Sequence, residues 1–327
     1  MKQIVKPLVY AILFSFCVLV SCKDSEKKSE SSEETTAVEE VAHTPFFKLS
    51  LAQWSMNRMI RHEGVSPYTF AAKAKEWGFE GIEYVSQLYS KELEKYDSIE
   101  EGMKAIVERC KQESEAAGVK NVLIMVDHEG DLASPDEATR NQAVENHKKW
   151  VDAAAELGCH AIRVNTSGTN DPVEYLSSAQ DGLRKLSEYA ATKSINVIVE
   201  NHGGLSSDAP KLVEVIKVVG MDNCGTLPDF GNWCITWGEN GCDESYPDMY
   251  DGLERLMTVA KAVSAKSNDF DDEGNETQKD YVRMLQIVKD AGYSGYIGVE
   301  YEGNVLGEEE GIIATRDLLI NASKKVK

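Results

Sequence analysis

The chain has 327 residues, of which 55 are acidic and 35 are basic, and its formal net charge is −20. Proteins that bind the phosphates of nucleic acids need a cationic face, so this charge balance excludes nucleic acid as a partner. Roughly 280 residues follow the N-terminal segment, and α/β barrels of this size commonly form one domain. We therefore expect a single domain.

The first residues have the three-part form of a secretory signal peptide. Lys2 and Lys6 precede an apolar run from Leu8 to Val20, and Ser21 and Cys22 follow it. This run is shorter than the roughly 20 residues that a membrane-spanning helix needs, which favours a cleaved signal over a spanning anchor. The segment Leu-Val-Ser-Cys at residues 19–22 resembles the lipobox of bacterial lipoproteins. The resemblance implies cleavage before Cys22 and lipidation of its thiol.

Residues 1–21 are thus predicted to be a signal peptide, and residues 22–45 a lipidated, acidic and flexible tether. The tether is rich in Ser, Thr, Glu and Lys and offers almost nothing apolar to bury. We expect an exported protein, anchored by lipid to a bacterial membrane and facing either the periplasm or the cell surface. Membrane contact would then pass through the lipid anchor alone. The oligomeric state stays open.

From residue 46 to 327 short β-rich runs alternate with helical patterns, which predicts βα units and a parallel sheet. Eight such runs occur, at a spacing close to that of a (β/α)₈ TIM barrel, with a doubly wound open sheet as the alternative. The predicted strands are Phe47–Gln53, Gly81–Val85, Asn121–Val126, Ala161–Asn165, Asn196–Glu200, Cys224–Asp229, Ala262–Ser267 and Tyr296–Glu300.

Helix boundaries are marked at both ends. Ser66-Pro67 and the segment 134–137 (Ser-Pro-Asp-Glu) combine a capping residue with a proline or with first-turn acids, and each predicts the start of a helix. Four glycines, each following a helical run and preceding a strand, predict helix ends. These glycines are Gly78, Gly118, Gly158 and Gly292.

Five cysteines lie outside the signal and lipobox: Cys110, Cys159, Cys224, Cys234 and Cys242. None of them forms a Cys-x-x-Cys pair, which argues against a structural zinc site. Cys234 and Cys242 flank one loop and could form a disulfide in an oxidising compartment.

Carboxylates follow three of the apolar strands. Glu200, Asp229 and Glu300 each stand at the C-terminal end of a predicted strand, the end at which barrel active sites are built. Three converging anions repel one another unless protons or a cation compensate them. A divalent metal would supply that cation, and hard oxygen ligands favour Mn²⁺ or Mg²⁺, with Zn²⁺ possible.

With these positions the chain resembles the xylose isomerase-like family of sugar isomerase and epimerase TIM barrels, over residues 46–325. In that family a Glu after strand five, an Asp after strand six, a His after strand seven and a Glu after strand eight bind one divalent ion. The two Glu residues also act as acid and base. Glu200, Asp229 and Glu300 match three of the positions. The segment Ala262–Ser267 offers Lys266 and no histidine, and Asn232 stands where many relatives have a second one.

Two interpretations of these departures stay open. In the first, Glu200, Asp229 and Glu300 keep the metal with help from His202 or water, and Lys266 acts on the substrate as a cation. In the second, Lys266 replaces the metal and stabilises the developing oxyanion directly. Glu200, Glu300 and Lys266 are the predicted catalytic residues in both.

Further polar and aromatic side chains are expected to bind a sugar at the barrel mouth, since aromatic faces stack on sugar C–H surfaces and amides or imidazoles take the hydroxyls. Core packing is an equal alternative for Trp54 and Trp233. The long loop from Gly231 to Tyr246, with Trp237, is predicted to be a specificity lid. The predicted substrate-binding residues are Trp54, Glu83, His128, Asn165, Asn201, His202, Asn232 and Trp233.

The resemblance implies a sugar isomerase or epimerase that abstracts a proton next to a carbonyl, assisted by the metal, on a non-phosphorylated sugar or sugar derivative. A keto-glycoside lyase or hydrolase would begin with the same step. A catalytically silent sugar-binding lipoprotein is the other alternative. Its argument is the missing strand-seven histidine, and the survival of Glu200 and Glu300 speaks against it.

Overall fold

The computed structural model describes residues 43–327. The predicted signal peptide, Cys22 and nearly all of the predicted tether lie outside this range. The His43 imidazole makes a 2.8 Å hydrogen bond to the Ser323 hydroxyl, so the chain already contacts the folded domain before residue 46. No helix within residues 43–327 is long and apolar enough to cross a membrane.

Eight parallel strands form one sheet at the centre of the domain, in the order β6-β5-β4-β3-β2-β1-β10-β9. Two bridges, Thr226 to Ala260 and Asp229 to Ser264, connect its outer members, so the sheet curls into a barrel and the open-sheet alternative is wrong. The strands are β1 (Lys48–Ala52), β2 (Gly81–Val85), β3 (Lys120–Met125), β4 (Ala161–Val164), β5 (Asn196–Glu200), β6 (Cys224–Leu227), β9 (Val263–Ser267) and β10 (Tyr296–Tyr301).

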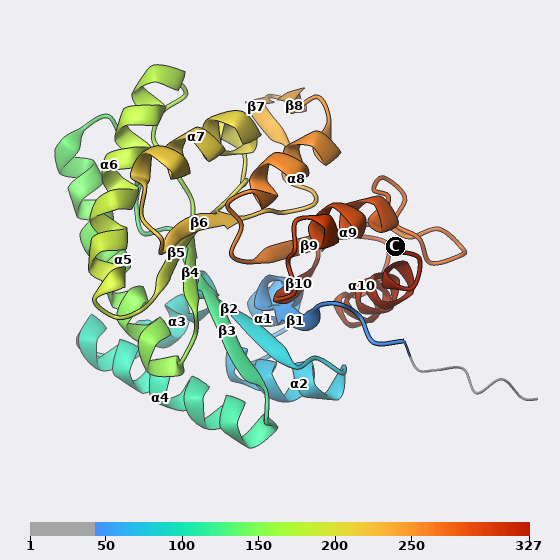
Figure 1. Cartoon of the computed structure of the whole chain (residues 1–327). Helices are drawn as coiled ribbons and strands as arrows, with labels where there is room; N and C mark the ends of the chain where they lie inside the picture. Colours follow the sequence, from blue (N-terminus) through green and yellow to red (C-terminus); the bar gives the residue numbers. More distant parts are fainter. Residues whose placement is uncertain (1–42) are drawn as a thin grey trace, which may run out of the picture. The chain divides into compact units, whose positions relative to one another are not determined.

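Helices surround the strands, as Figure 1 shows. They cover the outer face of the barrel, and Leu, Ile, Val and aromatic side chains fill the space between the two layers. The α-helices are α1 (Asn57–His62), α2 (Phe70–Glu76), α3 (Ser90–Leu93), α4 (Ile99–Ala117), α5 (Glu137–Leu157), α6 (Pro172–Ala191), α7 (Ala209–Val219), α8 (Met249–Met257), α9 (Tyr281–Asp290) and α10 (Glu308–Ser323). Short 3₁₀ turns are η1 (Gln53–Met56), η2 (Pro67–Thr69), η3 (Ser86–Tyr89) and η4 (Gly204–Ser207).

The predicted helix boundaries are confirmed, with one shift. Ser66 caps η2, which leads into α2, and its hydroxyl accepts a hydrogen bond from the Tyr68 backbone. In the segment 134–137 the capping residue is Asp136, whose carboxylate accepts from the Thr139 N–H, so α5 starts at the fourth residue of that segment. Gly118 and Gly158 end α4 and α5 in the left-handed conformation, with φ of 66° and 71°. Only glycine adopts that conformation at little cost.

Charged side chains lie among the apolar ones on the strands themselves. Glu83, Arg163, Glu200, Lys266 and Glu300 are all strand residues, and none of them is more than 4% exposed. Buried charges are costly unless they are paired, so their concentration on the strands marks the inside of the barrel as a functional region.

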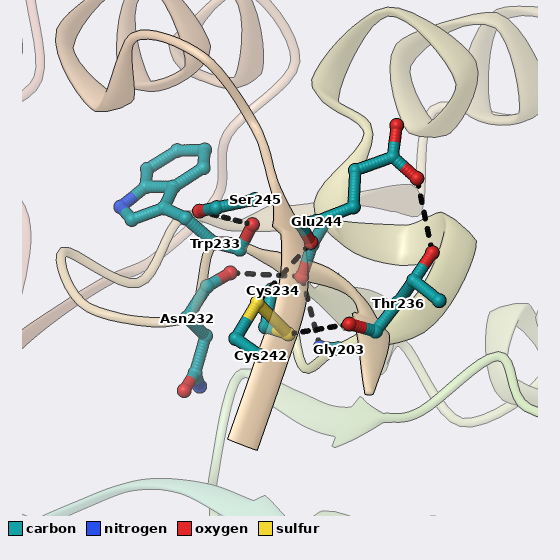
Figure 2. The surroundings of a disulfide bond; sticks show 9 residues. Gly203, Asn232, Trp233, Cys234, Thr236, Cys242, Glu244 and Ser245 are labelled. Atoms are coloured by element: carbon teal, nitrogen blue, oxygen red, sulfur yellow. Dashed lines mark hydrogen bonds between the residues drawn. A yellow bond between two sulfur atoms is a disulfide. The ribbon is translucent and has the colours of Figure 1, made fainter. Parts of the chain in front are cut away.

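The loop that follows β6 contains a hairpin of β7 (Cys234–Gly238) and β8 (Gly241–Ser245). A disulfide joins Cys234 to Cys242, so the bridge that the sequence left open is formed in the structure. Figure 2 shows the bond, together with the hydrogen bond from the Thr236 hydroxyl to the Glu244 carboxylate. The segment is therefore a cross-linked hairpin and not an irregular loop.

Candidate active site

Three carboxylates from non-neighbouring parts of the sequence meet inside the barrel mouth. Glu200 ends β5, Asp229 follows β6, and Glu300 lies on β10. Glu200 and Asp229 are completely buried, and Glu300 is 3% exposed. One carboxylate oxygen of each residue lies within 4.8 Å of those of the other two. The structure thus brings together the three residues that the sequence proposed as metal ligands.

Asp229 is held by the turn that it begins. Its Oδ1 accepts hydrogen bonds from the backbone N–H groups of Gly231 and Asn232, at 2.9 and 2.8 Å. The Asn201 side chain fixes the backbone, because its carbonyl oxygen accepts from the Asp229 N–H and its amide donates to the Asp229 carbonyl. Oδ2 is buried without a hydrogen-bond partner. Burial raises the pKa of Asp229 to about 7, against the opposing charge of Lys266.

Glu200 lies between a cation and an amide. The Arg163 Nε is 2.8 Å from Oε2, in an ion pair without hydrogen-bond geometry, and the Asn232 amide donates to Oε1 at 2.8 Å. Burial raises the pKa of Glu200 to about 7, since it outweighs the stabilising charge of Arg163, and the nearby charge of Glu300 adds to the rise.

Lys266 on β9 reaches into the same cluster. Its Nζ is 3.7 Å from Oε1 of Glu300, and it donates hydrogen bonds to Asn232 Oδ1 at 3.1 Å and Glu302 Oε1 at 3.2 Å. Burial alone would lower the pKa of this amine, but the surrounding carboxylates, led by Asp229, hold it well above its usual range. The other oxygen of Glu300 accepts a hydrogen bond from the Ser264 hydroxyl at 2.8 Å. Lys266 is therefore a permanent cation of the site.

Arg163 is a site residue that the sequence reasoning missed. Besides its ion pair with Glu200, it donates a 2.7 Å hydrogen bond to Asp127. Burial would raise the pKa of Asp127, but the guanidinium outweighs it and lowers that pKa. A signal did exist, since an arginine inside the apolar run 161–164 has to find a buried anion.

A cavity of about 720 Å³ opens above these groups. Its lining carries five carboxylates, of Asp127, Glu129, Asp131, Glu300 and Glu302, against the two cations Arg163 and Lys266. The balance is anionic, which disfavours a phosphorylated ligand.

Five of the predicted substrate-binding residues line this cavity: Trp54, His128, Asn165, His202 and Asn232. Trp237 lines it too, and so does His147, which the sequence reasoning missed. The His147 Nδ1 lies 2.7 Å from the Ala143 carbonyl oxygen and must carry a proton to donate to it, so Nε2 is left as an acceptor.

Glu83, Asn201 and Trp233 are placed elsewhere, and the substrate contact expected of them does not agree with the structure. Glu83 points into the barrel interior, where its Oε1 accepts a 2.6 Å hydrogen bond from Ser50. Asn201 is completely buried beneath the Asp229 turn. The Trp233 indole is buried and donates to the Phe230 carbonyl, which agrees with the core-packing alternative.

The site fits a divalent cation on its own chemistry. A buried carboxylate oxygen without a partner, such as Asp229 Oδ2, loses the hydration of its charge and gains nothing in return. Three converging carboxylates are the hard oxygen donors that Mn²⁺ and Mg²⁺ prefer. Glu200, Asp229 and Glu300 could therefore hold one metal ion beside the ammonium of Lys266.

Residues 71–322 match the sequence profile of the family described as xylose isomerase-like TIM barrel, and the chain belongs to that family. No curated protein matches the sequence significantly.

Among solved structures, an L-ribulose 3-epimerase superposes with a TM-score of 0.65 at 14% identity, over 85% of this chain and 96% of its own. A 3-keto-D-glucoside 4-epimerase from E. coli gives a TM-score of 0.60 at 14% identity, over 84% and 99%. The IOLI protein, described with a binding zinc atom, gives 0.62 at 16% identity, over 86% and 99%. At these identities the likeness establishes the shared barrel fold.

Proposed function

We propose that this protein is a sugar isomerase or epimerase that abstracts a proton next to a carbonyl of a non-phosphorylated sugar or sugar derivative. The observation that carries the proposal is the convergence of two buried glutamates and a buried ammonium on one cavity. Glu300 and Lys266 line it, and Glu200 adjoins it through the Asn232 amide. Membership of a family whose fold is shared by sugar epimerases supports it.

The two glutamates act from different sides. β5 and β10 are separated in the closed barrel by β6 and β9, so Glu200 and Glu300 approach a substrate from separate walls. One carboxylate takes the proton from the carbon beside the carbonyl, and the other carboxyl returns a proton to the opposite face or to the neighbouring carbon. Asn232 orients both Glu200 and Lys266, because its amide donates to the first and its carbonyl oxygen accepts from the second.

The enediolate that forms in this step carries negative charge on oxygen. Lys266 is buried and stays protonated, so its ammonium can donate to that oxygen from a fixed position. A divalent ion held by Glu200, Asp229 and Glu300 would supply Lewis-acid polarisation of the same carbonyl. Mn²⁺ or Mg²⁺ suits the oxygen ligands best, and Zn²⁺ is the alternative.

The anionic lining of the cavity supports a neutral substrate, since Arg163 and Lys266, the cations that would receive a phosphate, are already engaged by carboxylates. We also propose that the protein acts outside the cytoplasm as a lipoprotein anchored through Cys22. The basis is the N-terminal sequence alone, with its short apolar run and lipobox-like segment.

The experiment that tests the function combines metal analysis with proton exchange. Purified residues 43–327 are analysed for metal content beside an Asp229→Ala variant, and both proteins are incubated in D₂O with a panel of aldoses, ketoses and keto-sugars. We expect about one divalent ion per chain, lost in the variant, and deuterium incorporation at the carbon next to a carbonyl. Glu200→Gln and Glu300→Gln should each abolish incorporation while leaving the circular dichroism spectrum unchanged.

Two results would count against the proposal. Full exchange activity in either glutamine variant would eliminate the two-carboxylate scheme. Tight sugar binding with no exchange for any member of the panel would instead identify a binding protein on an enzyme fold.

A further inference from the structure

Trp237 is a large aromatic residue with 68% of its surface open to solvent. It lies on β7, and its indole lines the same cavity as Lys266 and Glu300. A large apolar ring that is left open beside polar catalytic groups is a common arrangement for holding the C–H face of a ligand. It takes no part in the proton transfer proposed above.

Two features restrict where this indole can lie. The disulfide between Cys234 and Cys242 ties β7 to β8 within the hairpin that carries it. On its other side the ring lies against the backbone of Gly203, where an added Cβ would stand 3.0 Å from the indole Nε1. Gly203 also has φ of 88°, a conformation that favours glycine. The indole is thus held close to the end of β5, three residues after Glu200.

The cavity offers room beyond the reacting groups. Its 720 Å³ fall within the range of sites that hold drug-sized ligands, roughly 300–1,000 Å³, which is more than one sugar ring fills. Besides Glu300 and Lys266, the lining includes Asn165, Asp131 and Ser167, in the loops after β3 and β4. These residues supply hydrogen-bond acceptors and donors suited to hydroxyl groups and no apolar wall.

We propose that Trp237 forms a second-ring subsite, and that the substrate is a keto-glycoside or a disaccharide with a free carbonyl, and not a free monosaccharide. One sugar ring lies at Glu200, Glu300 and Lys266, and the ring linked to it stacks on the indole of Trp237. The inference rests on the proposed function for the identity of the first subsite. To that function the inference adds a class of substrate, and it names Trp237 as the residue that selects this class.

The test compares matched ligands by isothermal titration calorimetry with the Glu300→Gln protein, which prevents turnover. Each sugar of a hexose and pentose panel is supplied as the free sugar and, with a keto group on the ring, as the methyl glycoside, the phenyl glycoside and a disaccharide. For at least one sugar we expect the phenyl glycoside and the disaccharide to bind roughly 3–10-fold more tightly than the methyl glycoside, as expected for one ring stacked on an indole. Adding Trp237→Ala should remove this gain and leave methyl-glycoside binding unchanged.

Tyr96→Ala is the matched control, since Tyr96 is an exposed aromatic residue outside the cavity lining, and it should change none of these affinities. Equal binding of methyl and phenyl glycosides across the whole panel, or no binding by any form, would overturn the subsite. So would an equal loss for both glycosides in Trp237→Ala.

Failure of the subsite can be told apart from failure of the proposed function by deuterium exchange in the protein with Glu300 intact. Exchange on free sugars, with no gain for any glycoside, would keep the function and remove the subsite. A ring-dependent gain in binding without exchange on any ligand would keep the subsite and remove the proton-transfer function.

Discussion

The Nζ of Lys266 lies 3.7 Å from Oε1 of Glu300, with both side chains almost fully buried. The lysine is on the strand before β10, in the segment where relatives of this chain would carry a metal-binding histidine. A fixed positive charge therefore stands where the family resemblance implies a neutral ligand. Its contribution to folding can be separated from its contribution to the chemistry.

Replacing Lys266 by Met should destabilise the protein by about 3–5 kcal/mol, because Glu300 and Glu302 would lose their buried cationic partner. Urea denaturation followed by circular dichroism measures the loss. Lys279→Met is a matched control, since Lys279 and Glu276 form another buried ion pair, at 2.8 Å, outside the site. Both variants should lose comparable stability, and only Lys266→Met should lose exchange activity. Equal activity losses would indicate that Lys266 acts through stability alone.

Replacing Lys266 by His should strengthen metal binding. The change removes a cation that competes with the metal for Asp229 and Glu300, and it adds the imidazole ligand that the family resemblance implies. We expect the dissociation constant for Zn²⁺ to fall roughly tenfold or more, with a smaller effect for Mn²⁺, because imidazole suits zinc better. Titration calorimetry gives both values. Lys266→Gln removes the charge without adding a ligand, so an equal gain in that variant would assign the whole effect to electrostatics.

The eight strands of the barrel were predictable because each is a short apolar run, four of them preceded by one of the predicted helix-ending glycines, and a parallel barrel places all their carboxyl ends at one mouth. Glu200, Asp229 and Glu300 stand at those ends, so topology alone brought them together. The sequence could not reveal the pairing of Arg163 with Glu200 and Asp127, because the approach of side chains across neighbouring strands depends on the tilt and closure of the barrel.

The predicted substrate contacts of Glu83 and Trp233 fail for local structural reasons. Glu83 is the third of the five residues of β2, so its side chain lies within the barrel and does not reach the mouth. Trp233 stands in the loop that carries the mouth residues, but its indole N–H finds the Phe230 carbonyl and the ring turns inward. Polarity and position along the chain did not distinguish either residue from those that reach the cavity.

The disulfide of the hairpin should protect it locally without contributing to global stability. All five residues of β8 are exposed, so the hairpin shares little of the barrel core. Replacing Cys234 and Cys242 together by Ser should leave the urea midpoint of residues 43–327 nearly unchanged and speed proteolysis at the turn between Gly238 and Gly241. Mass spectrometry of the fragments locates the cut. A loss of roughly 2–3 kcal/mol in global stability would mean that the hairpin unfolds with the barrel.

Glu83 should make stability depend on pH. Burial raises its pKa from 4.5 to about 8, against the hydrogen bond from Ser50, and the charges of Glu300 and Glu200 raise it further. Below pH 4.5 this carboxyl is protonated in both the folded and the unfolded chain, so it does not lower the free energy of unfolding. Between pH 4.5 and about 8 the unfolded chain releases the proton while the folded chain keeps it, and stability falls as pH rises.

Glu83→Gln removes this titration and keeps an oxygen that can accept from Ser50. The variant should match the original protein near pH 4.5 and exceed it near pH 8 by on the order of a few kcal/mol, from 1.36 kcal/mol per pKa unit. Urea midpoints measured from pH 4.5 to 8 give the two curves. Glu80→Gln, at an exposed position three residues earlier, should leave the curve unchanged. Parallel curves for Glu83→Gln and the original protein would mean that Glu83 stays ionised inside the barrel. Cations of the active site would then stabilise its carboxylate.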